Sequence, residues 1–374
     1  MNGGFLPTTE NARLTICGKG TVMTFTSHLE IPELHAVATA EARARQTVLT
    51  KPAGSLGLLE DLAVQLAGIQ GGAPASRPAE AVIFAADHPV VKHGVSAYPP
   101  AVTAAMVENF VRGGAAASVL ARRLGVGLTV VDVGVATPYT RGVSGPGARL
   151  RRADVADLNE GDIRIEDAMS PAVYSAARAA GIDAIDALDA GTRVVVLGEM
   201  GIGNTTVAAA VVAALLGGDP AELVGSGTGV DRAGFDRKVA VVRDAVRRVV
   251  GTEPHHVLKA VGGREIAALV AAAGRAIERR MAVLVDGFIV SAAILALVRI
   301  DPRTRRSLIF AHRSREPGHA RILTALDARP LLDLDLRLGE ASGALVALPL
   351  LDLACALHGE MATFADAGVP ERAP

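Results

Sequence analysis

The sequence predicts an α/β protein built on a doubly wound parallel sheet of the Rossmann-like type. Short apolar and β-branched runs recur along the chain, and each is followed by a polar or glycine-rich loop and then by a helical pattern. Roughly 20–40 residues separate successive runs, as in strand–helix–strand units. Hydrophobic residues make up 50% of the 374-residue chain, so it can bury a large core.

Helical patterns near both ends of the chain predict a second, smaller domain. We expect residues 27–75 and 320–374 to form this small helical domain together, and residues 76–319 to form the large α/β domain. Residues 1–26 are expected to be an N-terminal extension, because Thr, Glu, Asn and Arg are scattered through them and they lack the apolar core of a signal peptide.

The composition excludes several classes of partner. Aromatic residues make up 3% of the chain and the formal net charge is −1, so no surface for nucleic acid is expected. Cys17 and Cys355 are isolated thiols without metal-ligand spacing, which fits a reducing cytoplasm. Residues 281–298 are apolar enough to consider as a membrane span, but Asp286-Gly287 interrupts them. We therefore expect a cytoplasmic protein, with a buried strand running into a buried helix at 281–298.

The elements follow from apolar periodicity and from the loops between the apolar runs. The expected strands are 81–86, 127–134, 192–196, 282–285 and 307–310. The expected helices are 31–49, 55–66, 103–124, 170–187, 207–216, 233–250, 321–328 and 344–361, and one more opens after Val261. Ser55 is placed to cap the second helix. Residues 137–165 are polar and rich in Arg, which predicts a long surface loop.

A glycine-rich turn joins the strand at 192–196 to its helix and is the first candidate for a binding site. Gly201 and Gly203 let the backbone turn tightly and approach a ligand closely. Asn204 and Thr205 add side-chain donors beside the free amides of the helix N-terminus, which suits a phosphate. The pattern fits equally well a tight turn with a capped helix, because neither P-loop nor dinucleotide spacing is present.

A second glycine-rich turn, Gly227-Thr228-Gly229, precedes the helix that carries Lys238. The two turns and this lysine could close on one phosphate from different sides. The alternative is that Lys238 lies on the helix surface, as most helical lysines do.

Two glutamates are candidates for the chemistry. Glu199 stands at the carboxyl end of a strand, where open α/β sheets bind ligands. Glu340 follows Gly339 and precedes a strongly apolar helix, and apolar surroundings raise the pKa of a carboxyl group toward that of a general base. An acidic residue that favours the helix dipole explains Glu340 equally well.

Polar residues also follow the strand at 81–86. Asp87 and His88 come directly after it and lead into a loop that contains Ser96, Tyr98 and Pro100. We favour a functional role over simple turn chemistry, because the loop is long and carries both Gly and Pro.

Taken together, these motifs closely resemble the nicotinate-nucleotide:dimethylbenzimidazole phosphoribosyltransferases, which make the lower-ligand nucleotide of cobalamin. The resemblance runs from about residue 30 to the end of the chain. The matching segments are 51–57 (KPAGSLG), 87–88 (DH), 94–99 (GVSAYP), 198–206 (GEMGIGNTT), 227–229 (GTG), 261–263 (VGG), 286–289 (DGFI), 312–314 (HRS), 316–319 (EPGH), 337–340 (RLGE), 342–344 (SGA) and 361–369 (MATFADAGV).

The resemblance implies transfer of the 5-phosphoribosyl group of nicotinate mononucleotide to 5,6-dimethylbenzimidazole, with inversion at the anomeric carbon and without metal or redox cofactor. It makes Glu340 the general base, places Glu199 at the reacting centre and implies a homodimer. The expected phosphate-binding residues are Gly201, Gly203, Asn204, Thr205, Gly227, Thr228, Gly229 and Lys238. The expected acceptor-pocket residues are Asp87, His88, Ser96, Tyr98, Pro100, Ser314 and Leu338.

Two positions depart from the family pattern. Pro89 stands where the family usually has Gly, and Pro100 stands where it commonly has Gln. Proline offers neither an amide hydrogen nor a side-chain hydrogen bond. Adenine, another benzimidazole or a phenol therefore stays open as the acceptor. A non-catalytic nucleotide-binding regulator is the alternative from another class, although the retention of Glu199 and Glu340 speaks against it.

Overall fold

Six parallel strands form the sheet at the centre of the protein, in the order β3-β2-β1-β4-β5-β6. The computed structural model describes residues 29–140, 142–153, 155, 160–227 and 229–370, so the expected extension 1–26 and Thr228 lie outside the described residues. The strands are β1 (Ala79–Ala86), β2 (Gly127–Gly134), β3 (Arg149–Arg152), β4 (Val194–Met200), β5 (Ala282–Val285) and β6 (Leu308–Phe310). This order is that of dinucleotide-binding doubly wound sheets, and it confirms the predicted Rossmann-like class.

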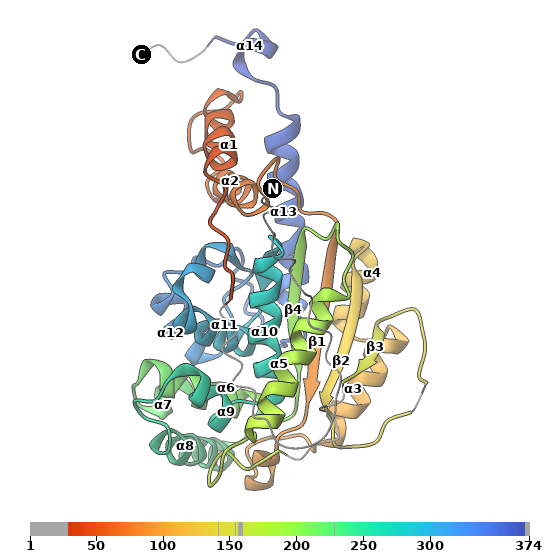
Figure 1. Cartoon of the computed structure of the whole chain (residues 1–374), viewed down its shortest axis with the longest axis vertical. Helices are drawn as coiled ribbons and strands as arrows, with labels where there is room; N and C mark the ends of the chain where they lie inside the picture. Colours follow the sequence, from red (N-terminus) through yellow and green to blue (C-terminus); the bar gives the residue numbers. More distant parts are fainter. Residues whose placement is uncertain (1–28, 141, 154, 156–159, 228, 371–374) are drawn as a thin grey trace, which may run out of the picture.

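Helices cover both faces of the sheet (Figure 1). One face carries α5, α10 and α11, and the other carries α2, α3, α4 and α13. Their bounds and those of the remaining helices are α1 (Ala36–Val48), α2 (Leu58–Gln70), η1 (Pro89–His93), α3 (Ala101–Arg112), α4 (Ala116–Leu124), α5 (Pro171–Asp186), α6 (Asn204–Leu216), α7 (Pro220–Leu223), α8 (Arg232–Arg247), α9 (Pro254–Val261), α10 (Arg264–Glu278), α11 (Phe288–Ile300), η3 (Pro302–Ser307), α12 (Pro317–Ala325), α13 (Ser342–Glu360) and α14 (Phe364–Ala367).

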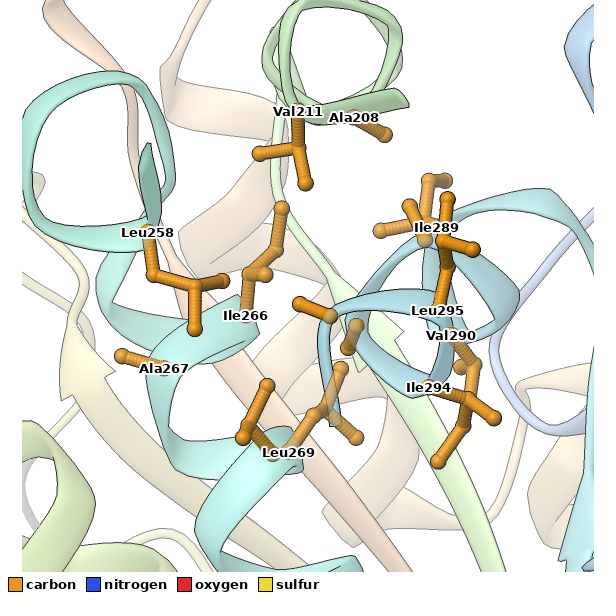
Figure 2. Close-up of a cluster of buried hydrophobic side chains, with 14 of the residues drawn as sticks. Ala208, Val211, Leu258, Ile266, Ala267, Leu269, Ile289, Val290, Ile294 and Leu295 are labelled. Atoms are coloured by element: carbon orange, nitrogen blue, oxygen red, sulfur yellow. The ribbon is translucent and has the colours of Figure 1, made fainter. Parts of the chain in front are cut away.

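The strands are apolar along their whole length because both of their faces are covered. Along β1, Val82 and Phe84 point into one core, whereas Ala81 and Ile83 point into the other, as the two-residue period of a strand requires. Figure 2 shows part of the first core, where side chains of α6, α9, α10 and α11 meet. The sheet is therefore held from both sides, and its strand ends are fixed.

Two strongly apolar segments are buried within the protein. Residues 281–298 contain β5 and all but the last turn of α11, a buried strand and helix as expected. The helix α13 is long and apolar enough to cross a membrane by length and composition alone. It contains Pro349, contacts β4 and β5, and contributes Leu345 and Leu348 to the second core. These contacts identify α13 as a helix of the protein core.

We propose that α1, α2, α13 and α14 form the expected small helical domain. The helices α1 and α2 contact each other, and α2 contacts α13 (Figure 1). Gln46 of α1 hydrogen-bonds His358 of α13 at 3.0 Å, and Leu49 forms a β-bridge with Thr363. In contrast, α12 contacts α6, α7 and α11, so this part of the 320–374 segment packs with the large α/β domain.

Three expectations about local structure are wrong. Ser55 does not cap α2, because the capping position is Gly57. The predicted helix 103–124 is two helices, because Gly113 adopts a left-handed conformation with φ of 86° and ends α3. The predicted loop 137–165 contains β3, which pairs with β2 at the edge of the sheet. Its arginines alternate with only one apolar residue, Leu150, so the segment lacks the apolar run by which we recognised the other strands.

Candidate active site

A cleft of about 650 Å³ opens at the carboxyl ends of β4, β5 and β6, where open α/β sheets bind ligands. Its described lining comes from the end of β4, from the segments that follow these strands, from α3 and the loop before it, from the turn after α7 and from the loop before α13. The lining residues are Tyr98, Val102, Met106, Glu199, Met200, Gly201, Ile202, Asn204, Thr205, Gly227, Gly287, Phe288, Ile289, His312, Ser314, Glu316, Asp335, Leu336, Arg337, Leu338, Gly339 and Glu340.

The β4–α6 turn forms one wall of the cleft and needs its glycines. A Cβ atom on Gly201 would lie 2.3 Å from the Ala86 carbonyl oxygen, which no side chain tolerates. Gly203 has φ of 102°, a conformation that other residues rarely adopt, and it does not itself line the cleft. Asn204 and Thr205 occupy the first turn of α6 and line the cleft beside Gly201. The turn thus presents a helix N-terminus to the cleft.

Lys238 lies behind this wall rather than on the helix surface. Its side chain is buried, and its Nζ donates hydrogen bonds to Thr205 Oγ1 at 3.1 Å and to the Gly225 carbonyl at 3.0 Å. An ammonium group has three protons, and these two acceptors account for two of them. Burial lowers the pKa of Lys238 to about 8, against the opposing effect of the Glu316 charge. Lys238 therefore places a positive charge directly beneath Thr205.

Among the described residues of the second glycine turn, Gly227 lines the cleft. Gly229 is not among the described residues that line it, and Thr228 lies outside the described part of the chain. Glu316, which carried no signal in the sequence, is buried and lines the cleft beside Gly227. Burial raises the pKa of Glu316, whereas Lys238 lowers it.

Two buried carboxyl groups, those of Glu199 and Glu340, line the same cleft. Glu199 ends β4 and accepts a hydrogen bond from the Asn204 side-chain amide. Burial, reinforced by the charges of Asp286, Glu265 and Glu340, raises the pKa of Glu199 to about 8. Burial and Asp286 raise the pKa of Glu340 to about 7. Two carboxyl groups with raised pKa values in a cleft are typical of proton transfer near neutral pH.

The loop that carries Glu340 has an unusual backbone. Glu340 and Ala341 have φ of 61° and 62°, and Gly339 before them has φ of 81°. Left-handed conformations at non-glycine residues cost free energy and concentrate at functional sites. Glu340 stands just before the first turn of α13 and is buried in the cleft, a position that fits either interpretation of this residue.

The expected acceptor pocket is only partly assembled around the cleft. Tyr98, Ser314 and Leu338 line it. Ser96 stands outside the described lining, and its Oγ accepts a hydrogen bond from the Tyr98 amide at 3.1 Å. Pro100 is exposed at the start of α3 and also stands outside the lining. No signal in the sequence indicated the apolar wall that α3 contributes next to Tyr98.

Asp87 and His88 lie behind the β4–α6 turn instead of lining the cleft. The Asp87 carboxylate accepts a hydrogen bond from the Ala136 amide at 2.9 Å. His88 Nε2 lies 3.1 Å from Glu265 Oε1 in a fully buried ion pair. Burial alone would lower the pKa of His88, but Glu265, Glu160 and Asp87 raise it to about 9. With this raised pKa, His88 carries a positive charge at neutral pH. Its side chain packs against Gly201 and Gly203 on the side of the turn away from the cleft.

Asp286 and His312 are further polar residues at the strand ends that were not expected as site residues. His312 lines the cleft, and its Nε2 lies 3.5 Å from Asp286 Oδ1. Asp286 follows β5 and His312 follows β6 by two residues, so the rule that placed Glu199 after β4 could have found both.

Comparisons with known proteins agree with this architecture. A family model described as phosphoribosyltransferase matches residues 31–369. The chain is 50% identical over 349 residues to the nicotinate-nucleotide–dimethylbenzimidazole phosphoribosyltransferase of Bradyrhizobium sp. (strain ORS 278), covering 92% of this chain and 97% of that protein. It is 51% identical over 335 residues to the protein of the same name from Xanthomonas axonopodis pv. citri (strain 306), covering 88% and 94% respectively.

The crystal structure of the protein of that name from Thermus thermophilus superposes with a TM-score of 0.82. It is 41% identical in sequence, and the match covers 90% of this chain and 99% of that one. The class of protein defined by the fold, the cleft and the family model is a phosphoribosyltransferase. Within that class, the chain belongs to the nicotinate-nucleotide–dimethylbenzimidazole phosphoribosyltransferase family.

Proposed function

We propose that this protein transfers the 5-phosphoribosyl group of nicotinate mononucleotide to 5,6-dimethylbenzimidazole, releasing nicotinate and α-ribazole 5′-phosphate for the nucleotide loop of cobalamin. One observation carries the proposal. A single cleft joins a glycine turn suited to a phosphate with two buried carboxyl groups suited to proton transfer, Glu199 and Glu340. The 50% identity to relatives that bear this enzyme's name supports it.

The donor phosphate binds at the β4–α6 turn. The amides of Gly201 and Gly203, the side chains of Asn204 and Thr205, and the Gly227–Gly229 turn with Thr228 supply its hydrogen bonds. The buried Lys238 neutralises part of its charge through its third proton, beside the two given to Thr205 and Gly225. A phosphate fixed at this end, away from the breaking bond, holds the ribose in line for attack.

The reaction needs one base and little else. A ring nitrogen of dimethylbenzimidazole attacks the anomeric carbon, and the bond from that carbon to the pyridinium nitrogen breaks. The bonding electrons pass to the pyridinium, which leaves as neutral-ring nicotinate without acid assistance. The acceptor's N–H proton passes to Glu340, whose pKa of about 7 suits this transfer. Glu199, at the same end of the cleft, faces the sugar on which positive charge develops.

The acceptor base lies against the apolar side of the cleft. Val102 and Met106 of α3, together with Tyr98 and Leu338, supply this surface, and Ser314 adds a polar group. Asp87, His88 and Ser96 stand behind the lining and hold its shape. Pro100 contributes no hydrogen bond to the acceptor, so apolar contacts decide which base fits. Adenine, another benzimidazole and p-cresol are the alternatives to dimethylbenzimidazole.

A release assay tests this function. The purified protein is incubated with nicotinate mononucleotide and, in separate reactions, with dimethylbenzimidazole, adenine or p-cresol, and nicotinate and ribosylated product are measured. We expect the fastest release with dimethylbenzimidazole and none without an acceptor. Preference for another base would change the acceptor but keep the reaction. Absence of release with every acceptor would leave only the nucleotide-binding regulator.

We also infer that the enzyme is a cytoplasmic homodimer. Apolar side chains are exposed on the outer sides of α1 and α13, among them Val37, Val48 and Leu353, and burial in a dimer would remove them from water. Light scattering on the purified protein should give twice the 38.3 kDa mass of the chain. A monomer at micromolar concentration would contradict the inference.

A further inference from the structure

Asp286 is a buried carboxylate beside the two carboxyl groups of the cleft. Val285, the last residue of β5, pairs with Leu197 of β4, so Asp286 leaves the sheet next to the strand end that carries Glu199. The side chain of Asp286 is 1% exposed. Its Oδ2 has no hydrogen-bond partner among the residues that the structure describes. A charge buried in this way requires a reason, because its desolvation is costly.

Its other oxygen holds the loop that carries the base. Asp286 Oδ1 accepts a hydrogen bond of 2.9 Å from the Ala344 amide, in the first turn of α13. Ala344 lies four residues after Glu340, and the residues between them include the strained Ala341. A strained backbone persists only where its surroundings fix it. The bond to Asp286 fixes the start of α13 and therefore the direction in which Glu340 leaves the loop.

The charges around Asp286 are mostly negative. Glu199 from β4 and Glu340 from the loop before α13 both face it, and its charge raises the pKa of each. His312, after β6, lies 3.5 Å from Asp286 Oδ1. His319 of α12 is held neutral, since burial first and His312 second lower its pKa to about 3. A third negative charge here makes Glu340 a stronger base and favours positive charge on the sugar.

We propose that Asp286 is a positioning residue for the base, which orients Glu340 through the Ala344 amide and adds a negative charge to the reacting end of the cleft. This inference rests on the proposed function, in which Glu340 accepts the proton. Asp286 itself acts through Glu340 and is not assigned a contact with either substrate.

The Asp286→Asn variant separates charge from shape. Asparagine keeps an oxygen for the Ala344 amide but removes the negative charge. We expect the acidic limb of the kcat–pH profile to move at least about half a pH unit lower, because one like charge is gone. The plateau rate should fall about tenfold, since a weaker base faces a less negative cleft. The KM for nicotinate mononucleotide should change little, because the phosphate binds at the other end.

A second readout does not depend on turnover. The ¹³C NMR titration of the Glu340 carboxyl, assigned by its loss in the Glu340→Gln variant, should show a lower midpoint in Asp286→Asn than in the wild type. If the asparagine variant folds poorly, Asp286→Ser replaces it. Serine also keeps a short hydrogen-bond acceptor without the charge, and this variant should show the same lower midpoint. Failure of the wild type to release nicotinate would remove the proposed function, but the titration would still report whether Asp286 acts on Glu340.

Asp132 provides a matched control. It is buried near the end of β2, and its Oδ1 accepts hydrogen bonds from the Gly134 and Val135 amides. Like Asp286, it is therefore a buried carboxylate that holds backbone amides near the end of a strand. Asp132→Asn should leave the Glu340 midpoint and the acidic limb unchanged. An unchanged Glu340 midpoint in both Asp286 variants would overturn the proposal and reduce Asp286 to a helix anchor.

Discussion

The carboxyl group of Glu199 lies directly against Gly339, the residue before Glu340, although the two segments lie far apart in the sequence. The fit is close, since a Cβ atom on Gly339 would lie 2.4 Å from Glu199 Oε1. Glu199 is fixed by the sheet, and Glu340 is fixed against it by a strained loop. The cleft therefore holds two carboxyl groups in one place before any substrate binds, which is the preorganisation that proton transfer requires.

The rate of transfer should depend on the Glu340 carboxylate. In Glu340→Gln we expect kcat to fall by about two to four orders of magnitude, the usual range for a general base, while donor binding survives. In the wild type, kcat should fall below about pH 7, because the carboxyl group is then protonated and cannot accept a proton. Steady-state kinetics across pH measure both effects. Glu360→Gln, at the exposed end of α13, is the control, and equal rates for the two variants would remove Glu340 from the chemistry.

The same carboxyl group should destabilise the fold at alkaline pH. The pKa of Glu340 rises from 4.5 to about 7 on folding, so between these values the folded protein keeps a proton that the unfolded chain has lost. Stability therefore falls as pH rises through this window. Glu340→Gln removes the burial of this charge and should be more stable than the wild type by about 1–3 kcal/mol at pH 8. Chemical denaturation at pH 8 and pH 4 tests this, and the gain should disappear at pH 4, below the unfolded pKa.

Lys238 should act on donor binding rather than on chemistry. In Lys238→Ala we expect the KM for nicotinate mononucleotide to rise about ten- to a hundredfold, because one charge-assisted hydrogen bond to the phosphate is lost. Since the pKa of Lys238 is lowered to about 8, wild-type donor binding should weaken above pH 8, where the ammonium loses its proton. Lys92→Ala removes an exposed lysine and serves as control. Unchanged donor affinity in Lys238→Ala would exclude Lys238 from the phosphate site.

His88 should stabilise the protein through its buried ion pair. Its folded pKa of about 9 lies above the ordinary value of 6.5, so its contribution is complete below pH 6.5 and is lost as pH rises through 9. His88→Gln should cost about 3–5 kcal/mol at pH 6.5, because Glu265 is left buried without its cation. Denaturation of His88→Gln and of His88→Gln with Glu265→Gln separates the causes. The double variant should recover much of the loss, and no recovery would argue for simple packing.

Much of the fold follows from local patterns in the sequence. Five of the six described strands could be recognised in the sequence as apolar runs. Glu199, Asp286 and His312 lie at or just after the carboxyl ends of three of these strands, where the parallel-sheet rule places ligand-binding residues. The edge strand β3 escaped prediction because Arg149, Arg151 and Arg152 are mostly exposed and form no apolar run. The other edge strand, β6, was predictable because its three residues are apolar and buried.

The site was less predictable than the fold because it depends on packing between distant segments. The sequence singled out Lys238 but could not tell a buried amine beneath Thr205 from a surface lysine. The sequence placed His88 in the acceptor pocket, because a position after a strand does not indicate on which side of a neighbouring turn the side chain lies. Glu316 carried no local signal, because its burial results from the approach of α12 to the Gly225–Gly227 turn.

The most direct test of the proposed mechanism is the crystal structure of the Glu340→Gln variant with nicotinate mononucleotide and dimethylbenzimidazole bound. We predict the phosphate at the Gly201–Thr205 turn and above Lys238. We also predict an acceptor ring nitrogen within about 2.6–3.2 Å of the side chain at position 340, the reach of a general base. A phosphate bound elsewhere, or an acceptor with both nitrogens turned away from that side chain, would contradict the mechanism.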